Sequence, residues 1–250
     1  MLISDSKKRL QINSDKRKKI LMFLLENRYS NLDNISVAIN QKSNAGASRV
    51  LQKLIAEKLV KKVVINKNFV RVTLFGITQK GIDELNFFVD DYSPFYPSRV
   101  STANLKHTLI NQRILTVLKK RTKKNYTDIK TINAEFGNLK QYEHIYKFKH
   151  RPDGLFVAKE KENGEIVVFI IETELSLKNT KRYKEIFREY IQHCRATKIR
   201  QVLYFVRDDS AKKRLRKIID TIAADLSKDR AELDLIQTMF HIYLVDKFQN

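Results

Sequence analysis

The stretch RPDGLFVAKEKENGEIVVFIIETEL, residues 151–175, constrains the fold of this chain most strongly. Two apolar runs, residues 154–158 and 166–171, flank the polar turn KENGE, and this pattern predicts a β-hairpin. The second run is too apolar for a strand that faces water, so we expect it to be buried. It nevertheless ends in two carboxylates, Glu172 and Glu174, and their presence at the end of a buried strand needs a chemical explanation.

Three carboxylates are expected to converge at one edge of this hairpin. Side chains alternate along a strand, so Glu172 and Glu174 share a face. Asp153 begins the partner strand, and an antiparallel hairpin places the start of one arm beside the end of the other. Clustered buried acids are unfavourable unless they are paired. One resolution is a bound Mg²⁺ or Mn²⁺ held by Asp153, Glu172 and Glu174; the other is pairing with nearby lysines and arginines.

The chemistry of such a site is phosphodiester cleavage, because a divalent ion polarises the phosphate and lowers the pKa of an attacking water. The charge of the chain agrees with a nucleic-acid partner. Lys and Arg number 49 against 28 Asp and Glu, a net charge of +21, which favours binding to a polyanion. The 250 residues suggest one large or two small domains.

Several features exclude other classes of protein. No run of 18 apolar residues is present, so we expect no membrane insertion. The N-terminus is polar and lacks the apolar core of a signal peptide. The single Cys194 excludes an intramolecular disulfide framework and a cysteine-cluster zinc site. Together these features predict a soluble cytoplasmic protein.

The first ninety residues predict three helices followed by a two-stranded hairpin. Residues 14–27 have apolar positions at helical spacing after a capping Ser, and the segments NLDNISVAIN and SNAGASRVLQKLIAEKLVKK are two further helices. Strands are expected at residues 60–65 and 70–75, with a last helix from Gln79. This order resembles bacterial winged-helix regulators. We therefore predict an N-terminal winged helix-turn-helix domain over residues 1–92.

A winged helix of this kind places the N-terminal part of its third helix in the major groove. The residues on the polar face of that helix are candidates for reading base edges: Asn44, Ser48, Arg49, Gln52 and Lys53. The cations of the wing suit DNA phosphates: Lys61, Lys62, Lys67 and Arg71. The alternative, a solvated helix face on a winged helix that binds protein, stays open.

The remainder of the chain predicts a second domain after a proline-containing linker at residues 93–104. An amphipathic helix, LKHTLINQRILTVLKK, opens residues 105–250. Strands follow at HIYKFK, at both arms of the hairpin, at QVLYFV and at HIYLV, with helices at KNTKRYKEIFREYIQHCRA and SAKKRLRKIIDTIAADL between them. The expected fold is α/β (α+β), an α/β sandwich with a mixed sheet rather than strict βα alternation.

The hairpin resembles the core of PD-(D/E)xK nucleases. The segment RPD supplies Asp153 and ETE supplies Glu172 at the positions of that motif, which implies a restriction-endonuclease-like fold. Glu174 departs from the motif, which has a lysine there that orients or helps to deprotonate the nucleophile. Either Glu174 is itself a ligand or base, or a cation of the following segment replaces that lysine. The candidate cations are Lys178, Lys181 and Lys184.

The order of motifs along residues 15–206 is similar to the replication-relaxation family of mobile elements, and within it to MobC-type plasmid relaxases. The order is a winged helix, LKHTLINQR, an acid helix NAEF, RPDGLFV, FIIETELS and a helix with a K…Y pattern. The resemblance implies metal-dependent, site- and strand-specific nicking of DNA at a plasmid or mobile-element transfer origin, which starts conjugative mobilisation. It also implies an accessory mobilisation protein and a coupling ATPase as partners.

Carried over by position, the resemblance makes Asp153, Glu172 and Glu174 the metal-site acids. Lys184 and Tyr190 match the helix after them. Tyr183 and Tyr190 lie seven residues apart on that helix, hence on one face. A tyrosine nucleophile would conserve the energy of the broken bond for rejoining. Metal-bound water as the nucleophile, and simple core packing of both tyrosines, stay open.

Three further residues are weaker candidates for the site: Glu135, His107 and Asn111. Glu135 belongs to the expected acid helix, and the other two lie one turn apart in HTLINQR. A surface glutamate and a domain-interface pair are the alternatives. The five histidines contain no His-hydrophobic-His motif, so the carboxylates must hold the metal.

Two other functions remain open from the sequence. One is a double-strand endonuclease of the restriction or transposon type, against which the missing lysine counts. The other is a winged-helix regulator of plasmid replication or transcription with a decayed nuclease domain. Cleavage of RNA ranks lower because a winged helix favours duplex DNA. The expected DNA is a double-stranded origin with a single-stranded nick region, and pairing of two copies on a palindromic site would make a homodimer.

Overall fold

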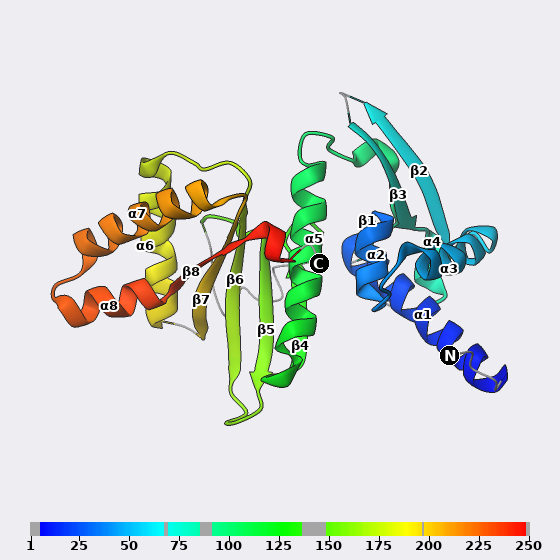
Figure 1. Ribbon diagram of the computed structural model, residues 1–250, viewed down its shortest axis with the longest axis horizontal. Helices are drawn as coiled ribbons and strands as arrows, with labels where there is room; N and C mark the ends of the chain where they lie inside the picture. Colours follow the sequence, from blue (N-terminus) through cyan, green and yellow to red (C-terminus); the bar gives the residue numbers. More distant parts are fainter. Residues whose placement is uncertain (1–5, 68–69, 86–91, 137–148, 197, 249–250) are drawn as a thin grey trace. The chain divides into compact units, whose positions relative to one another are not determined.

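A computed structural model of the protein describes residues 6–67, 70–85, 92–136, 149–196 and 198–248 (Figure 1). The chain forms two compact units, Met1–Gln112 and Arg113–Asn250. Both helices and strands are present and the larger sheet is mixed, which confirms the predicted fold class. Within the described residues, no helix combines the length and the apolar character that a membrane crossing requires.

In the described part of the first unit, three α-helices precede the β2–β3 hairpin and a short α-helix follows it. The small antiparallel sheet has the order β1-β3-β2, and this element order is that of a winged helix. Its elements are α1 (Ser6–Asn27), β1 (Tyr29–Ser30), α2 (Leu32–Ala38), α3 (Asn44–Ala56), β2 (Val60–Lys67), β3 (Val70–Ile77), α4 (Gln79–Asp83) and a short 3-10 helix (Pro97–Arg99). The first helix begins eight residues before the predicted start at Ser14, because neither Gly nor Pro interrupts residues 6–14.

The core of the first unit follows the predicted helical spacing. Leu21 and Leu24 of α1 and Leu51 and Leu54 of α3 are almost fully buried in one apolar cluster. The side chain of Asn31 caps the N-terminus of α2 by accepting a 2.9 Å hydrogen bond from the Asn34 N–H. These contacts fix α3, whose other face is polar.

The segment predicted as a linker, residues 93–104, packs on the first unit instead. The Phe95 side chain is buried, and its backbone N–H donates a 2.8 Å hydrogen bond to the Ile77 carbonyl. Its ring lies against Gly76, where a Cβ atom would overlap it. The division between the units accordingly lies inside α5 (Leu105–Arg121), after Gln112, which corrects the predicted boundaries at residues 92 and 105.

The second unit is built on a five-stranded sheet in the order β4-β5-β6-β7-β8. Strands β4, β5 and β6 pair antiparallel, and β6, β7 and β8 pair parallel. The elements are a 3-10 helix (Thr122–Lys124), β4 (Tyr126–Asn133), β5 (Gly154–Glu160), β6 (Ile166–Glu174), α6 (Thr180–Ala196), β7 (Ile199–Val206), α7 (Asp209–Leu226), α8 (Arg230–Thr238), β8 (Phe240–Leu244) and a 3-10 helix (Val245–Phe248).

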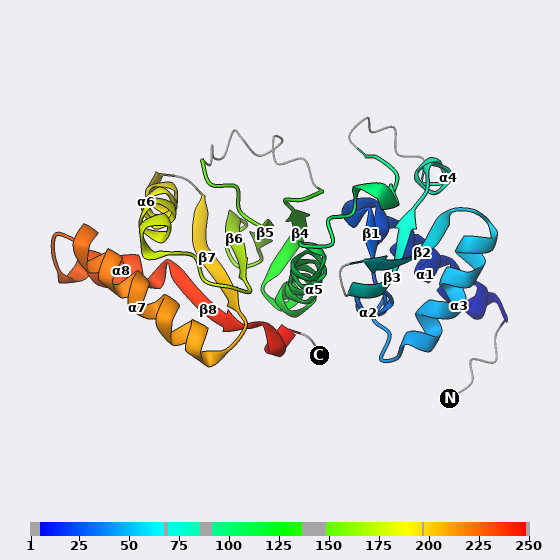
Figure 2. The ribbon, with the colours of Figure 1, turned by 90° about the horizontal axis from the view of Figure 1, so that it is seen from above.

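Helices cover both faces of this sheet. Figure 2 shows α6, α7 and α8 on one face and α5 on the other. On the first face, Ile170 of β6 shares a core cluster with Phe187 of α6 and Ile219 of α7. On the second face, a Cβ on Gly154 would lie 3.3 Å from the methyl carbons of Leu115 in α5. Because β6 is covered on both sides, it is apolar almost throughout and all its residues after Ile166 are buried.

Two predicted elements need comment. The predicted strand HIYKFK lies outside the described residues apart from Lys149, which is in a bend, and the first strand of the sheet is β4. The predicted acid helix NAEF is a turn after β4. Asn133 closes this turn, since its side-chain oxygen accepts from the Glu135 N–H at 3.1 Å and its carbonyl accepts from the Phe136 N–H.

Candidate functional site

The structure brings the three predicted carboxylates together at the carboxyl end of β6. Glu172 and Glu174 are 2% and 4% exposed and share one face of the strand. Gly154 pairs with Ile171, so Asp153 comes alongside Glu172. The Thr173 N–H donates a 2.7 Å hydrogen bond to Asp153 Oδ2, which fixes that carboxylate at the strand end.

Glu172 is held by two aromatic side chains. His150 Nε2 lies 3.0 Å from Glu172 Oε1, and the Tyr190 hydroxyl donates to the same oxygen. Tyr190 comes from α6 and is fully buried, and burial followed by the Glu172 charge raises the pKa of its hydroxyl. His150 precedes Asp153 by three residues, in the segment that leads into β5. These contacts orient the Glu172 carboxylate.

Glu174 has a different partner. Lys178 Nζ donates to Glu174 Oε1, and the Lys178 backbone N–H donates to the Tyr183 hydroxyl at 3.3 Å. Burial raises the pKa of Glu174, Lys178 opposes that rise, and the charges of Glu172 and Asp153 add to it. Glu174 is thus a buried carboxylate that is held by a lysine.

Tyr204 completes the cluster from the adjacent strand β7. It pairs with Glu172 in the parallel register and is 1% exposed. Burial, followed by the charges of Glu172 and Glu174, raises the pKa of its hydroxyl. In the part of the chain that the structure describes, this hydroxyl has no hydrogen-bond partner. A buried donor of this kind beside carboxylates can serve a water or a ligand oxygen.

The donor set fits a hydrated divalent ion held by two carboxylates better than a cage of three. Among the described residues, no three His, Cys, Asp or Glu side chains are grouped so as to hold a metal ion. Glu174 is tied to Lys178, which argues against its predicted role as a third ligand. Mg²⁺, however, keeps several waters and uses one or two carboxylates together with substrate phosphates. Asp153 and Glu172 meet that requirement.

The other predicted site residues lie as follows. Lys184 Nζ pairs with Asp225 Oδ2 at 3.0 Å on the exposed surface of α6 and α7, so the structure does not bring it to the carboxylates. Glu135 is exposed in the turn after β4. His107 and the buried Asn111 belong to the first unit, in α5. Lys178, by contrast, donates to the carboxylate of Glu174.

Sequence reasoning missed His150 and Tyr204. His150 lies three positions before the motif acid Asp153, and this proximity in the sequence could have marked it as a candidate for the site. Tyr204 carries no signal in the sequence, because its place opposite Glu172 depends on the parallel register of β7 with β6. A tyrosine in an apolar strand is typical of a core residue.

The predicted base-reading residues lie on the face of α3 opposite its buried side. Ala47, Leu51 and Leu54 are buried. Ser48 is half-buried and the others are exposed: Asn44, Arg49, Gln52 and Lys53. The Asn44 side chain donates a 2.6 Å hydrogen bond to Asp33 of α2. These polar side chains are at least partly accessible on α3, and their role in reading base edges stays a prediction.

The wing cations divide between two faces of the β2–β3 hairpin. Lys62 and Arg71 are exposed and share one face, because Lys62 pairs with Phe75 and Asn66 pairs with Arg71. Lys61 lies on the other face, with its ammonium 5.4 Å from the centre of the Phe95 ring. This contact gives Lys61 a packing role. The side chain of Lys67 lies outside the described residues.

Comparison with protein-family models, curated proteins and solved structures found no match to this chain. The similarity to the replication-relaxation family therefore stays a prediction from the order of its motifs.

Proposed function

We propose that the protein is a metal-dependent DNA nickase in which the winged-helix unit binds duplex DNA and the second unit cuts one strand. The observation that carries this proposal is the half-buried Asp153 beside the buried Glu172 at the end of β6, with Glu174 of the same strand paired to the Lys178 ammonium. Two carboxylates at the end of a core strand do not help folding, because burying them is unfavourable. Such arrangements are concentrated at functional sites.

Each residue of the cluster has a distinct part in the proposed reaction. A divalent ion, when bound, polarises the phosphodiester and lowers the pKa of its water. Asp153 and Glu172 would hold that ion. The Thr173 N–H positions Asp153, and His150 and Tyr190 orient Glu172 through their hydrogen bonds. Supporting groups of this kind commonly change metal affinity or activity about 10- to 100-fold when they are removed.

Lys178 is the proposed substitute for the motif lysine that position 174 lacks. Glu174 holds the Lys178 ammonium at the cluster, and the side chain of Lys178 stays 24% exposed, so it can reach a bound phosphate. Lys184 is engaged with Asp225, and Lys181 is exposed at the start of α6. In this proposal Glu174 positions the Lys178 ammonium and is not itself a metal ligand.

Water is the proposed nucleophile. Tyr183 and Tyr190 are both fully buried, and burial raises the pKa of each hydroxyl. A nucleophilic tyrosine must reach the phosphorus atom and lose its proton, and both requirements are unfavourable here. In hydrolysis the water loses a proton to the solvent as its oxygen bonds to phosphorus, the bond to the leaving sugar oxygen breaks, and that oxygen takes up a proton from the solvent.

The target DNA and the protein partners rest on the order of motifs alone. Nicking at a transfer origin, together with an accessory mobilisation protein and a coupling ATPase, is part of the proposal on that basis. Hydrolysis does not conserve the energy of the broken bond, so rejoining would need a nucleophile outside this cluster.

A DNA-binding regulator with a decayed nuclease domain is the second candidate function, and one observation favours it. Each carboxylate has a protein donor: Thr173 N–H for Asp153, Tyr190 for Glu172 and Lys178 for Glu174. The cluster is therefore satisfied without a metal ion. In that case the winged helix would supply the whole function.

A nicking assay on supercoiled plasmid DNA with Mg²⁺ or Mn²⁺ tests the proposal. The plasmid should carry the sequence that surrounds the gene of this protein. Wild type should produce open circles, and Asp153→Asn and Glu172→Gln should each lose about 100-fold or more of the rate. Lys184→Gln is the matched control, because its surface pair lies outside the cluster. DNA binding without nicking by wild type would favour the regulator.

A further inference from the structure

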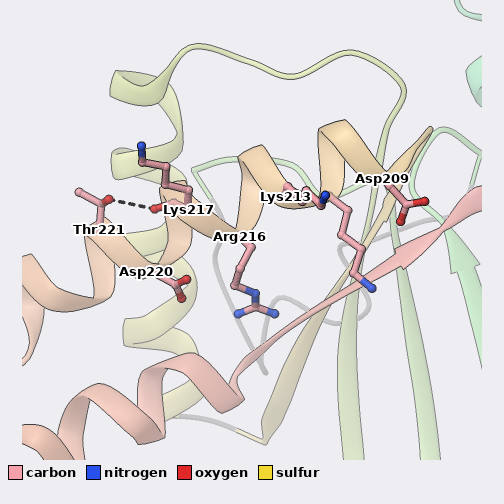
Figure 3. A pocket seen from close by; sticks show the side chains of 7 residues that line it. Asp209, Lys213, Arg216, Lys217, Asp220 and Thr221 are labelled. Atoms are coloured by element: carbon pink, nitrogen blue, oxygen red, sulfur yellow. Dashed lines mark hydrogen bonds between the residues drawn. The ribbon is translucent and has the colours of Figure 1, made fainter.

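The N-terminal half of α7 carries a dense group of cations that the proposed reaction does not use. Five of the six positions in KKRLRK are basic: Lys212, Lys213, Arg214, Arg216 and Lys217. Four of them line a hollow of about 530 Å³ together with Asp209, Asp220 and Thr221 (Figure 3). The hollow is thus a surface feature with a strong positive excess.

The four lining cations outnumber the two lining carboxylates, Asp209 and Asp220. Arg216 donates a 3.1 Å hydrogen bond to the Phe240 carbonyl, which holds its guanidinium at the hollow. Asp220 accepts from the Gln237 side chain at 3.0 Å. In the part of the chain that the structure describes, no ion pair involves Lys212, Lys213 or Lys217. Their charges remain available to a ligand.

Helix stability does not account for this placement. Cations stabilise a helix in its last turn, where the macrodipole is negative. Nevertheless α7 has all five within residues 209–217 and no basic residue in its last turn. Lys212 and Arg216, and likewise Lys213 and Lys217, are like-charge pairs four residues apart, which destabilise a helix. An anionic ligand would relieve this repulsion.

We propose that the hollow on α7 binds the sugar-phosphate backbone of DNA. This inference rests on the proposed function, since it gives the second unit its own contact with the DNA that it cuts. Residues 212–217 extend about 7.5 Å along the helix axis, which exceeds a single phosphate group and suits a chain of them. Lysines that contact phosphates add affinity without reading sequence.

A membrane surface fits α7 less well. A helix that lies on a membrane inserts an apolar face opposite its basic face. The apolar face of α7 is already buried in the core of the second unit through Leu215, Ile218, Ile219 and Ile222. Only the polar and basic side of α7 remains for a partner.

The start of α7 lies at the same edge of the sheet as the carboxylates. Glu174 at the end of β6 pairs with Val206 at the end of β7, and α7 begins three residues after Val206. A second cavity of about 320 Å³ lies between the loop that follows Glu174 and the start of α7. Its lining includes residues 175–177, which form the loop after Glu174, together with Arg207 and Arg214. A strand bound on α7 would therefore pass close to the cluster.

Salt-dependent DNA binding tests this inference. Full-length wild type is compared with Lys212→Gln/Lys213→Gln/Lys217→Gln and with Arg182→Gln/Arg188→Gln/Lys198→Gln, a control that removes three exposed cations outside the hollow. Fluorescence anisotropy of a labelled duplex, and of a single strand of equal length, gives Kd from about 50 to about 200 mM KCl. For the duplex, the slope of log K against log salt should fall by about 0.9 per lost phosphate contact, hence up to about 2.7.

The control should change this slope much less than the α7 variant. An unchanged slope in the α7 variant would overturn the inference, as would an equal fall in both variants, because diffuse charge would then explain binding. Wild-type binding to phosphatidylserine vesicles but not to DNA, lost in the α7 variant, would assign the hollow to a membrane. If wild type nicks DNA but the α7 variant binds DNA as wild type does, this inference alone is overturned. If DNA binding depends on the α7 cations but wild type does not nick, only the proposed function is overturned.

Discussion

Single residues decide how the carboxylate cluster can work. Position 174 has the opposite charge to the lysine expected from the nuclease motif, and the structure shows Glu174 bound to the Lys178 ammonium. In the proposed reaction, Lys178 supplies the cation four residues later in the chain. Choosing Lys178 among three lysines required the structure, because the loop between β6 and α6 has no period from which a side-chain direction follows.

The pH dependence of stability should show the burial of Glu174. Burial raises its pKa above the ordinary value of 4.5, so the folded state binds this proton more tightly than the unfolded chain does. The stability from Glu174 is thus present at low pH and is lost as the pH rises through the folded pKa. Glu174→Gln stays neutral. In EDTA, its free energy of unfolding relative to wild type should increase from about pH 4.5 upward.

Urea unfolding of both proteins at a series of pH values measures this difference. Lys184→Gln, whose partner Asp225 lies on the surface, serves as the comparison and should show little change with pH. A difference for Glu174→Gln that stays constant or shrinks with rising pH would contradict the account of this residue.

The single thiol provides a second test at this scale. Burial raises the pKa of Cys194 to about 12. At about pH 8 the native thiolate fraction should be roughly three orders of magnitude below that of an unfolded chain, and the thiolate is the reactive form. Labelling with a disulfide reagent should therefore be slow in native protein and fast in urea. Equal rates in both conditions would show that the helix α6 opens around this residue.

At the scale of elements, the sequence predicted what depends on local pattern. The hairpin β5–β6 follows from two apolar runs and a polar turn, and burial of β6 follows from its unbroken apolar character. The linker prediction failed because a proline-containing segment can still pack through one aromatic residue, and Phe95 does so against Gly76. Such a contact between distant segments has no signature in the local sequence.

Gly76→Ala should destabilise the first unit. The new Cβ would overlap the buried Phe95 ring, so the ring must move or the strand must shift, at about 1–3 kcal/mol of unfolding free energy. The double-mutant cycle with Phe95→Leu isolates this contact: Gly76→Ala should cost less in the Phe95→Leu background. Chemical unfolding measures both values. Additive effects would mean that the two residues do not touch in solution.

At the scale of the whole molecule, composition and charge indicated a DNA partner, and alternation with antiparallel pairing predicted that Asp153, Glu172 and Glu174 would meet. The sequence could not predict the partners of these carboxylates. They come from α6, from the segment before β5 and from the loop after β6, namely Tyr190, His150 and Lys178. Tertiary contacts of this kind decide whether an acidic cluster is a metal centre or a satisfied network.

Binding of Mn²⁺ to the DNA-free protein, measured by isothermal titration calorimetry, tests the central claim most directly because it needs no knowledge of the DNA target. We expect wild type to bind Mn²⁺ and Asp153→Asn/Glu172→Gln to lose that binding. Glu174→Gln should retain it, since Glu174 holds Lys178, and the surface variant Asp225→Asn should match wild type. No Mn²⁺ binding by wild type, or equal binding by the double variant, would contradict a metal centre built from Asp153 and Glu172.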